Sequence, residues 1–187
     1  NIFLSFNGIH SPFWDYFMSS FTGKFIWIPM YATILYILLK NFHWKVVMCY
    51  VAAIALTITF ADQMCSSIIR PVVARLRPAN PENPIVDLVY IVNGYRGGSY
   101  GFPSCHAANS LGLAMFVIFL FRKRWLSIFI LTWAILNCYT RIYLGVHYPG
   151  DLLVEVLSED SAVGCSALSP TKQPSIWNLP PARREKK

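Results

Sequence analysis

Four uncharged, apolar runs constrain this chain more than any other feature. They cover residues 25–39, 46–61, 107–121 and 125–140. A helix that crosses a bilayer needs about 17–25 residues, and the lysines, arginines and histidines beside these runs can extend them to that length by placing their charges at the interface. Only 13% of the chain is charged, whereas a soluble domain has about 25% charged residues. We therefore expect an all-α fold, a multi-pass transmembrane helical bundle, rather than a soluble helical core.

The connections within each pair of runs are short and basic. Lys40 and Lys45 flank the first connection, and residues 122–124 (Arg-Lys-Arg) fill the second. The positive-inside rule places both in the cytoplasm, so that residues 1–24, 62–106 and 141–151 lie on the outer side. That outer side nevertheless carries five arginines, at positions 70, 75, 77, 96 and 141. Cations placed against the charge bias indicate an anionic ligand.

Composition excludes several classes of protein. The net charge of +7 suits anionic lipid or an anionic substrate, but no basic face remains for nucleic acid once the apolar runs are set aside. Five cysteines without a Cys-x-x-Cys pair indicate neither a zinc site nor a disulfide framework. Residues 1–23 lack the pattern of a cleavable signal peptide and are typical of an aromatic segment at the membrane interface. We expect His10 and Asp15 within it to be surface polar residues.

A cation, an imidazole and a carboxylate follow the last apolar run. Arg141, His147 and Asp151 lie within eleven residues, and ionisable groups near lipid are usually functional. If a helix starts near Pro149, Asp151 lies in its first turn and can fix the tautomer of His147, which leaves the other ring nitrogen as a base or nucleophile. Arg141 offers a fork of donors to a phosphate or carboxylate. The alternative is an interfacial anchor with no chemistry.

The long connection between the second and third runs divides in two. Residues 62–77 are expected to continue the second helix, with Arg70 and Arg77 on one face two turns apart and Pro78 ending the helix. Residues 78–103 are rich in Pro, Gly and Asn and predict an ordered loop. Ser104 and His106 then stand at the N-terminus of the third helix, where free N–H groups favour an anion. Taken singly, Ser104 could be an ordinary N-cap and Arg77 a helix-terminal cation.

Three stretches together resemble a known signature. They are Arg70-x6-Arg77-Pro78, Pro103-Ser104-Cys105-His106 and Thr140-Arg141-x5-His147-x3-Asp151. This order is similar to that of the type 2 phosphatidic acid phosphatases (PAP2), whose superfamily includes vanadium haloperoxidases and whose pattern is Lys-x6-Arg-Pro, Pro-Ser-Gly-His and Ser-Arg-x5-His-x3-Asp. The resemblance covers about residues 1–155. The aromatic opening looks most like the bacterial membrane-bound lipid phosphatases of the family.

The resemblance implies a role for each site residue. His147 would be the nucleophile that forms a phosphohistidine, Asp151 would orient it, and His106 would protonate the leaving oxygen and then activate water. The phosphate oxygens would be held by Arg70, Arg77, Ser104 and Arg141, with the backbone N–H groups of Cys105 and His106. Phosphoryl transfer depends mainly on positioning and charge stabilisation, and three guanidiniums can supply this without a metal or other cofactor.

Three positions depart from the family pattern. Arg70 replaces Lys, which keeps the charge but changes its geometry. Cys105 replaces Gly, which would be strained if the backbone needs a positive φ, and Thr140 replaces Ser. Cys105 as the nucleophile of a different phosphatase class is disfavoured, because the Cys-x5-Arg phosphate loop of that class is absent.

The end of the chain differs from what precedes it. The family has a final membrane helix after the Asp, but Glu155 interrupts the apolar residues here, and residues 158–187 contain five Ser, four Pro and eight charged residues. Such a composition predicts disorder. We therefore expect a membrane-embedded domain over residues 1–157 and a polar, disordered tail over 158–187, with the usual final helix missing or replaced. An interruption of the native chain near residue 154 and a genuine divergent tail are both open.

The sequence thus predicts a phosphatase in the bacterial cytoplasmic (inner) membrane, with its site facing the periplasm or exterior. It would hydrolyse a lipid phosphate monoester or pyrophosphate, such as phosphatidic acid, phosphatidylglycerol phosphate, undecaprenyl pyrophosphate or a lipid A phosphate. A lipid phosphotransferase and a catalytically impaired protein that binds anionic lipid are the alternatives. Arg75 and Arg96 are candidates for a second phosphate contact, or are solvated cations. No protein partner is predicted.

Overall fold

The computed structural model of the chain describes residues 2–23 and 25–152. The tail expected over 158–187 and the expected replacement of the final helix lie outside these residues. The described part consists of helices and loops, with one isolated antiparallel bridge between Leu76 and Tyr100. The all-α prediction is therefore confirmed for this part of the chain.

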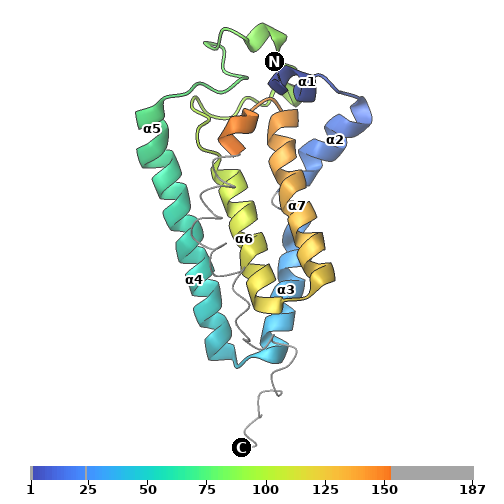
Figure 1. Cartoon of the computed structure of the whole chain (residues 1–187), viewed down its shortest axis with the longest axis vertical. Coiled ribbons are helices and arrows are strands. Elements are labelled where there is room, and N and C mark those ends of the chain that lie inside the picture. Colours follow the sequence, from blue (N-terminus) through green and yellow to red (C-terminus); the bar gives the residue numbers. More distant parts are fainter. Residues whose placement is uncertain (1, 24, 153–187) are drawn as a thin grey trace, which may run out of the picture.

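Four long helices carry the four apolar runs and stand side by side (Figure 1). They are α3 (Ile28–Asn41), α4 (Trp44–Gln63), α6 (Cys105–Phe121) and α7 (Arg124–Tyr143). The α4 helix continues through the π-helical η2 (Met64–Ile69) into α5 (Arg70–Val73), which makes a helical segment of 30 residues.

Two of these segments are long and apolar enough to cross a membrane, namely Trp44–Val73 and α7. A third is added if α2 (Pro12–Phe21) and the segment Phe25–Asn41, which begins with η1 (Phe25–Trp27), form one span bent by 68°. The α6 helix is apolar but has only 17 residues. The chain is thus a helical membrane protein with two or three candidate spans in its described part.

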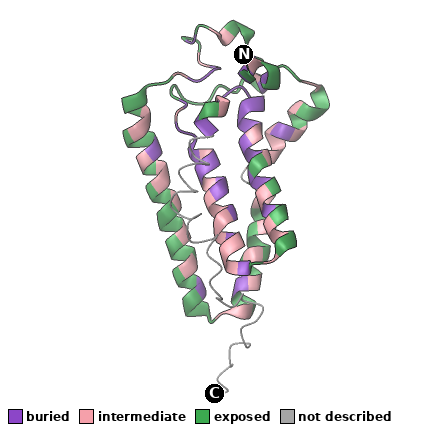
Figure 2. Cartoon of the chain, viewed as in Figure 1, coloured by how far each residue is buried: buried purple, intermediate pink, exposed green. Residues whose placement is uncertain are grey.

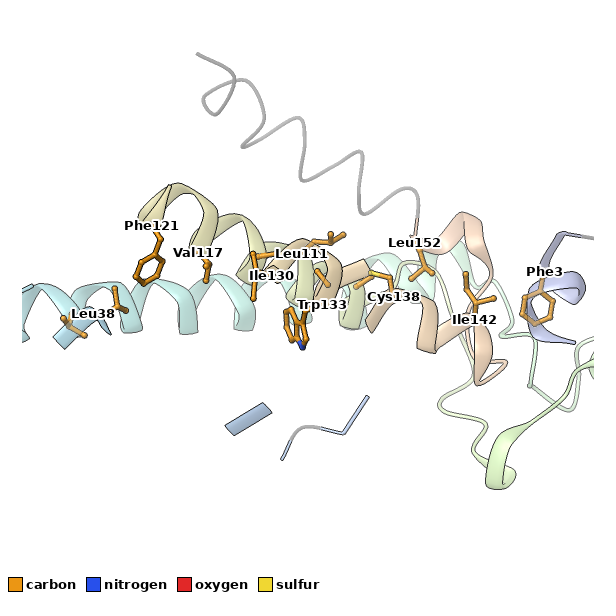
Figure 3. Packing of buried hydrophobic residues seen from close by; sticks show 14 of the residues in the cluster. Phe3, Leu38, Leu111, Val117, Phe121, Ile130, Trp133, Cys138, Ile142 and Leu152 are labelled. Carbon is orange, nitrogen blue, oxygen red and sulfur yellow. The ribbon is translucent and has the colours of Figure 1, made fainter. Parts of the chain in front are cut away.

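The core lies mainly between α6 and α7, whereas α4 is mostly exposed (Figure 2). Ala107, Ala114 and Ala134 are fully buried, and small side chains of this kind let membrane helices approach closely. Leu56 and Phe60 on α4 are 71% and 67% exposed, as expected for a surface that faces lipid. Figure 3 shows that the buried apolar cluster runs along the whole bundle, from Leu38 at one end to Phe3 at the other.

The helix predicted over residues 62–77 ends earlier than expected. Val73 is the last residue of α5, and Ala74 follows in the left-handed region with φ 48°. Beyond it the backbone pairs with a later strand-like segment, because Arg77 N donates to Ser99 O and Gly101 N donates to Arg75 O. This pairing extends residues 75–77, so the prediction that Arg70 and Arg77 share a helix face is wrong, as is the prediction that Pro78 ends the helix.

The amino-terminal segment forms two short helices that pack against α7. These are α1 (Ile2–Asn7) and α2, and Ser11 caps the latter by accepting a hydrogen bond from Trp14 N. The side chain of Asn7 is 1% exposed and donates to the carbonyls of Tyr90, Ile142 and Tyr143. Its Oδ1 accepts from Tyr90 N. One asparagine therefore ties the start of the chain to the end of α7.

His10 and Asp15 are not simple surface residues. The side chains of His10 and Asp15 are 9% and 17% exposed and lie 3.2 Å apart from Nδ1 to Oδ1. The hydroxyls of Tyr90 and Tyr143 donate to the same carboxylate at 2.9 and 2.7 Å. The expectation of surface polar residues is therefore wrong, because the long loop and α7 both close over this segment.

Candidate active site

The three stretches of the signature meet at one end of the bundle, where α5 ends, α6 begins and α7 ends (Figure 1). The short turns between α3 and α4 and between α6 and α7 lie at the opposite end. The loop of residues 74–104, with the 3₁₀ turns η3 (Val86–Leu88) and η4 (Val92–Gly94), lies over the site end. The helices thus act as a scaffold for side chains at this end of the bundle.

His147 lies on a tight turn just after α7. Gly145 has φ +74°, and a side chain there would come within 2.9 Å of Val89 Cγ1, so this position needs glycine. The N–H groups of Val146 and His147 both donate to Arg141 O. The turn buries the imidazole, which is 1% exposed.

The tautomer of His147 follows from its contact with Arg77. Arg77 Nη1 lies 3.3 Å from His147 Nε2. A guanidinium has no acceptor, so Nε2 must accept this hydrogen bond through its lone pair. The proton of the neutral ring is then on Nδ1, and Nε2 carries the electron pair that a nucleophile needs.

Asp151 lies on the other side of the imidazole. Residues 149–152 are helical, as predicted from Pro149, and His147 Nδ1 is 3.6 Å from Asp151 Oδ2. This distance is longer than a hydrogen bond, and Nδ1 has no hydrogen-bond partner among the described residues. Asp151 is fully buried, and its Oδ2 accepts from Tyr148 N at 2.8 Å. The carboxylate is therefore held next to the ring.

Arg75 holds the second oxygen of the same carboxylate. Its Nη1 donates to Asp151 Oδ1 at 2.8 Å, and its guanidinium lies 4.3 Å from the centre of the Tyr148 ring. The sequence offered only a second phosphate contact or a solvated cation for this residue, and neither describes it. Arg96, the other such candidate, donates to Ala79 O at 2.7 Å.

Arg77 and Arg141 lie near His147, and Arg70 lies near Arg77. Burial, and then the nearby charges of Arg70 and Arg141, lower the pKa of Arg77 to about 10. Burial, together with the charges of Arg77 and Arg141, lowers the pKa of His147 to about 4 against the opposing effect of Asp151. The cations therefore repel one another in a buried place, and an anion bound between them would relieve that repulsion.

The backbone of the long loop packs closely against the side chain of Arg77. Its Nε donates to Tyr100 O at 3.0 Å. A side chain at Gly97 would come within 2.8 Å of Arg77 Nη1, so glycine gives the guanidinium the room to face His147.

The start of α6 carries further residues that the sequence predicts to contact phosphate. Ser104 is fully buried and caps the helix by accepting from Ala107 N at 3.4 Å. Arg70 donates from Nε and Nη2 to the carbonyl of Pro103, at 3.3 and 3.2 Å, which places it beside the same turn. Cys105 begins the helix without a positive φ. The backbone strain considered for a non-glycine residue at this position is therefore absent.

His106 is joined to Arg141 through a residue that the sequence did not single out. Thr22 Oγ1 is 3.3 Å from His106 Nε2 and accepts from Arg141 Nη1 at 3.1 Å. Thr22 is the C-cap of α2, and in the sequence it is far from all three signature stretches. No pattern in the sequence could have identified it, because an isolated threonine near a glycine is ordinary.

Two cavities meet at Thr22, Gly23 and His106. One has a volume of about 410 Å³ and is lined by loop residues together with Arg141. The other, of about 420 Å³, extends down between the helices past Trp27, Ile58 and Leu113. A molecule with a polar head and an apolar chain could thus contact the site from both sides.

A helical membrane scaffold with a buried arginine cluster around an imidazole defines a protein that binds phosphate or a similar anion. Residues 46–157 match the sequence profile described as the PAP2 superfamily. This chain belongs to that family, and the expectation of a PAP2-type phosphatase is confirmed.

Individual relatives are similar over most of the chain. A protein named lipid A 4'-phosphatase, from Bacteroides thetaiotaomicron, is 79% identical over 152 residues, which are 81% of this chain and 68% of that protein. The lipid A 4'-phosphatase of Porphyromonas gingivalis is 36% identical over 153 residues, 82% of this chain and 64% of that protein. An undecaprenyl-diphosphatase from Sulfolobus acidocaldarius is 28% identical over 138 residues, 73% of this chain and 60% of that protein.

A solved structure shares the fold. The crystal structure of Aquifex aeolicus LpxE superposes with a TM-score of 0.63 and 23% sequence identity, covering 89% of this chain and 92% of that one. The chain spans about two thirds of the length of the curated relatives it matches.

Proposed function

We propose that this chain hydrolyses the 4'-phosphate of lipid A through a phosphohistidine at His147. The observation that carries the proposal is the contact between Arg77 and His147 inside a buried cluster of cations, because it combines an anion site with a nucleophile whose lone pair faces that site. The choice of lipid A rests on the names of the relatives at 79% and 36% identity.

The residues support a two-step displacement. His147 Nε2 attacks phosphorus, and the bond from phosphorus to the sugar oxygen breaks as the phosphorus–nitrogen bond forms. His106 gives its proton to the leaving oxygen. Water then attacks the phosphohistidine and loses its proton to His106, which releases inorganic phosphate and restores both imidazoles.

The remaining site residues stabilise charge. Asp151 balances the positive charge that develops on the imidazole of His147. The phosphate oxygens are held by Arg70, Arg77 and Arg141, together with Ser104 and the N–H groups of Cys105 and His106 at the start of α6. We propose that these cations suffice without a metal ion.

We place the reaction at the outer face of the cytoplasmic membrane. The basic turns that contain Lys40 and residues 122–124 lie at the end of the bundle opposite the site, and the positive-inside rule assigns such turns to the cytoplasm.

The test is phosphate release from lipid A by the purified protein in EDTA, with mass spectrometry to identify the phosphate removed. His147→Ala should abolish release, whereas His43→Ala, at the far end of the bundle on the N-cap of α4, should not. With ³²P-labelled lipid, wild type should also yield acid-labile, alkali-stable label on the protein.

Phosphatidic acid and undecaprenyl pyrophosphate serve as competing substrates. Faster release from either one would overturn the assignment to lipid A while leaving the site intact. No release from any of the three by folded wild-type protein would favour a lipid-binding protein without activity, and release only after adding a second lipid alcohol would favour a phosphotransferase.

A further inference from the structure

Thr22 connects two groups that the proposed reaction needs, Arg141 and His106. Its hydroxyl oxygen accepts a hydrogen bond from Arg141 Nη1 at 3.1 Å and lies 3.3 Å from His106 Nε2. Arg141 is 7% exposed, and its Nε has no hydrogen-bond partner among the described residues. Within the part of the chain that the structure describes, Thr22 thus links Arg141 to His106, the proposed acid–base group, through polar contacts.

The donor and acceptor pattern explains why a hydroxyl suits this position. Arginine only donates, so one lone pair of Thr22 Oγ1 is used by Arg141. The hydroxyl proton can then go to the lone pair of Nε2 when His106 is neutral there. When Nε2 carries a proton, the second lone pair of the hydroxyl accepts it. A hydroxyl can therefore bind Nε2 of His106 whether or not that nitrogen carries a proton.

The position of Thr22 beside two cavities makes this contact relevant to substrate binding. Thr22, Gly23 and His106 line both the loop-side cavity and the cavity between the helices. The hydroxyl therefore lies on the wall that the two cavities share, where the leaving sugar and the lipid chains of a substrate would meet.

We propose that Thr22 is a positioning residue that holds the ring of His106 against the leaving oxygen. The proposal rests on the acid–base role of His106 in the proposed function. Phosphate oxygens compete with Thr22 for Arg141, so substrate binding weakens one hydrogen bond of the hydroxyl and leaves its bond to His106 in place.

Three variants test this role by kinetics. Thr22→Val keeps the shape and removes the hydroxyl, Thr22→Ser keeps the hydroxyl, and Thr33→Val makes the same change at an exposed threonine of α3 whose hydroxyl donates to Pro29 O. Thr22→Val should lower kcat on lipid A about tenfold or more, because acid–base catalysis depends on position, and KM should change by less than about twofold. Thr22→Ser should stay within about threefold of wild type, a loss much smaller than that expected of valine.

Wild-type kcat in Thr22→Val, or an equal loss in the serine and valine variants, would overturn the proposal. A rise in KM at constant kcat would do so too, since it would assign Thr22 to substrate binding.

A second measurement does not depend on activity. The chain has four histidines, at positions 10, 43, 106 and 147, so their side-chain ¹⁵N resonances are few, and that of His106 is assigned by its loss in His106→Gln. Thr22→Val should shift the Nε2 resonance of His106, and Thr22→Ser should not. An unchanged Nε2 resonance of His106 in Thr22→Val would contradict the contact between Thr22 and His106. Lack of phosphate release by wild type with the shift present would instead reject the proposed function alone.

Discussion

The guanidinium of Arg75 donates to the buried carboxylate of Asp151 at 2.8 Å, and the side chain of Arg75 is itself 43% exposed. The other oxygen of that carboxylate accepts from the backbone and faces His147. An exposed cation thus anchors the buried anion beside His147, so the ring of His147 is supported from the surface of the protein.

Replacing Arg75 with glutamine should lower kcat on the lipid substrate by about tenfold, because Asp151 then keeps only its backbone partner and its position beside the imidazole loosens. The ion pair is partly exposed and screened by solvent, so the loss should be smaller than that in Asp151→Asn. Steady-state kinetics measure this, with Arg124→Gln, an exposed arginine at the opposite end of the bundle, as the matched control. A rise in KM alone would assign Arg75 to substrate binding instead.

The pH profile should show the depressed pKa of His147. Burial first, and then Arg77 and Arg141, lower this pKa from 6.5 to about 4. The unprotonated ring, which is the proposed nucleophile, should therefore persist as the pH falls through 6.5, so protonation of His147 should lower kcat/KM only near pH 4.

Removing Arg77, whose guanidinium contacts His147, should shift the acid limb of the pH profile. In Arg77→Gln the pKa of His147 should rise, so the acid limb shifts to higher pH even though the overall rate is lower. The second ionisation of the substrate phosphate is the same in both profiles and cancels in the comparison. Superimposable profiles would show that Arg77 does not act on the titration of His147.

Cys105 should be dispensable as a side chain. The proposed contribution of this residue is the backbone N–H at the start of α6, and its φ is not positive. Cys105→Ala exchanges a small buried side chain for a slightly smaller one and keeps that N–H, so it should retain activity within about threefold. Phosphate release from lipid A checks this against wild type. A loss as large as that of His147→Ala would instead make the thiol the nucleophile.

Asn7 should matter for stability. Asn7→Leu removes a buried amide that serves three carbonyls and one N–H, and leaving such groups without partners costs about 1–3 kcal/mol each. For a chain of this size 1 kcal/mol corresponds to about 2–4 °C, so the melting temperature in detergent should fall by several degrees. Asn41→Leu, which breaks one bond to Ile37 O, should lower it less, and equal effects would contradict the special role of Asn7.

The apolar runs and the family signature were sufficient to predict the helices and the meeting of the three signature stretches at one end of the bundle. The four runs lie within helices because apolar length and flanking cations are local properties. His147 and Asp151 came together as expected because a helix starting at Pro149 brings residues four apart onto one side.

What the sequence could not predict depends on contacts between distant segments. The early end of α5 results from pairing of residues 75–77 with residues 99–101, which no local propensity reveals. Thr22 reaches His106 and Arg141 across separations of 84 and 119 residues. The cluster of His10 and Asp15 is buried only because the loop before α6 and the end of α7 cover it.

The bonds from Asn7 to Tyr90 and Ile142 span 83 and 135 residues. Contacts between residues so far apart in the sequence form late, because the loop closure that precedes them is entropically unfavourable. The α1 helix can therefore reach its final position only after α7 has been synthesised and inserted. A nascent chain stopped before α7 lacks both these hydrogen bonds and the turn that carries His147, so the site can assemble only after α7 has been inserted.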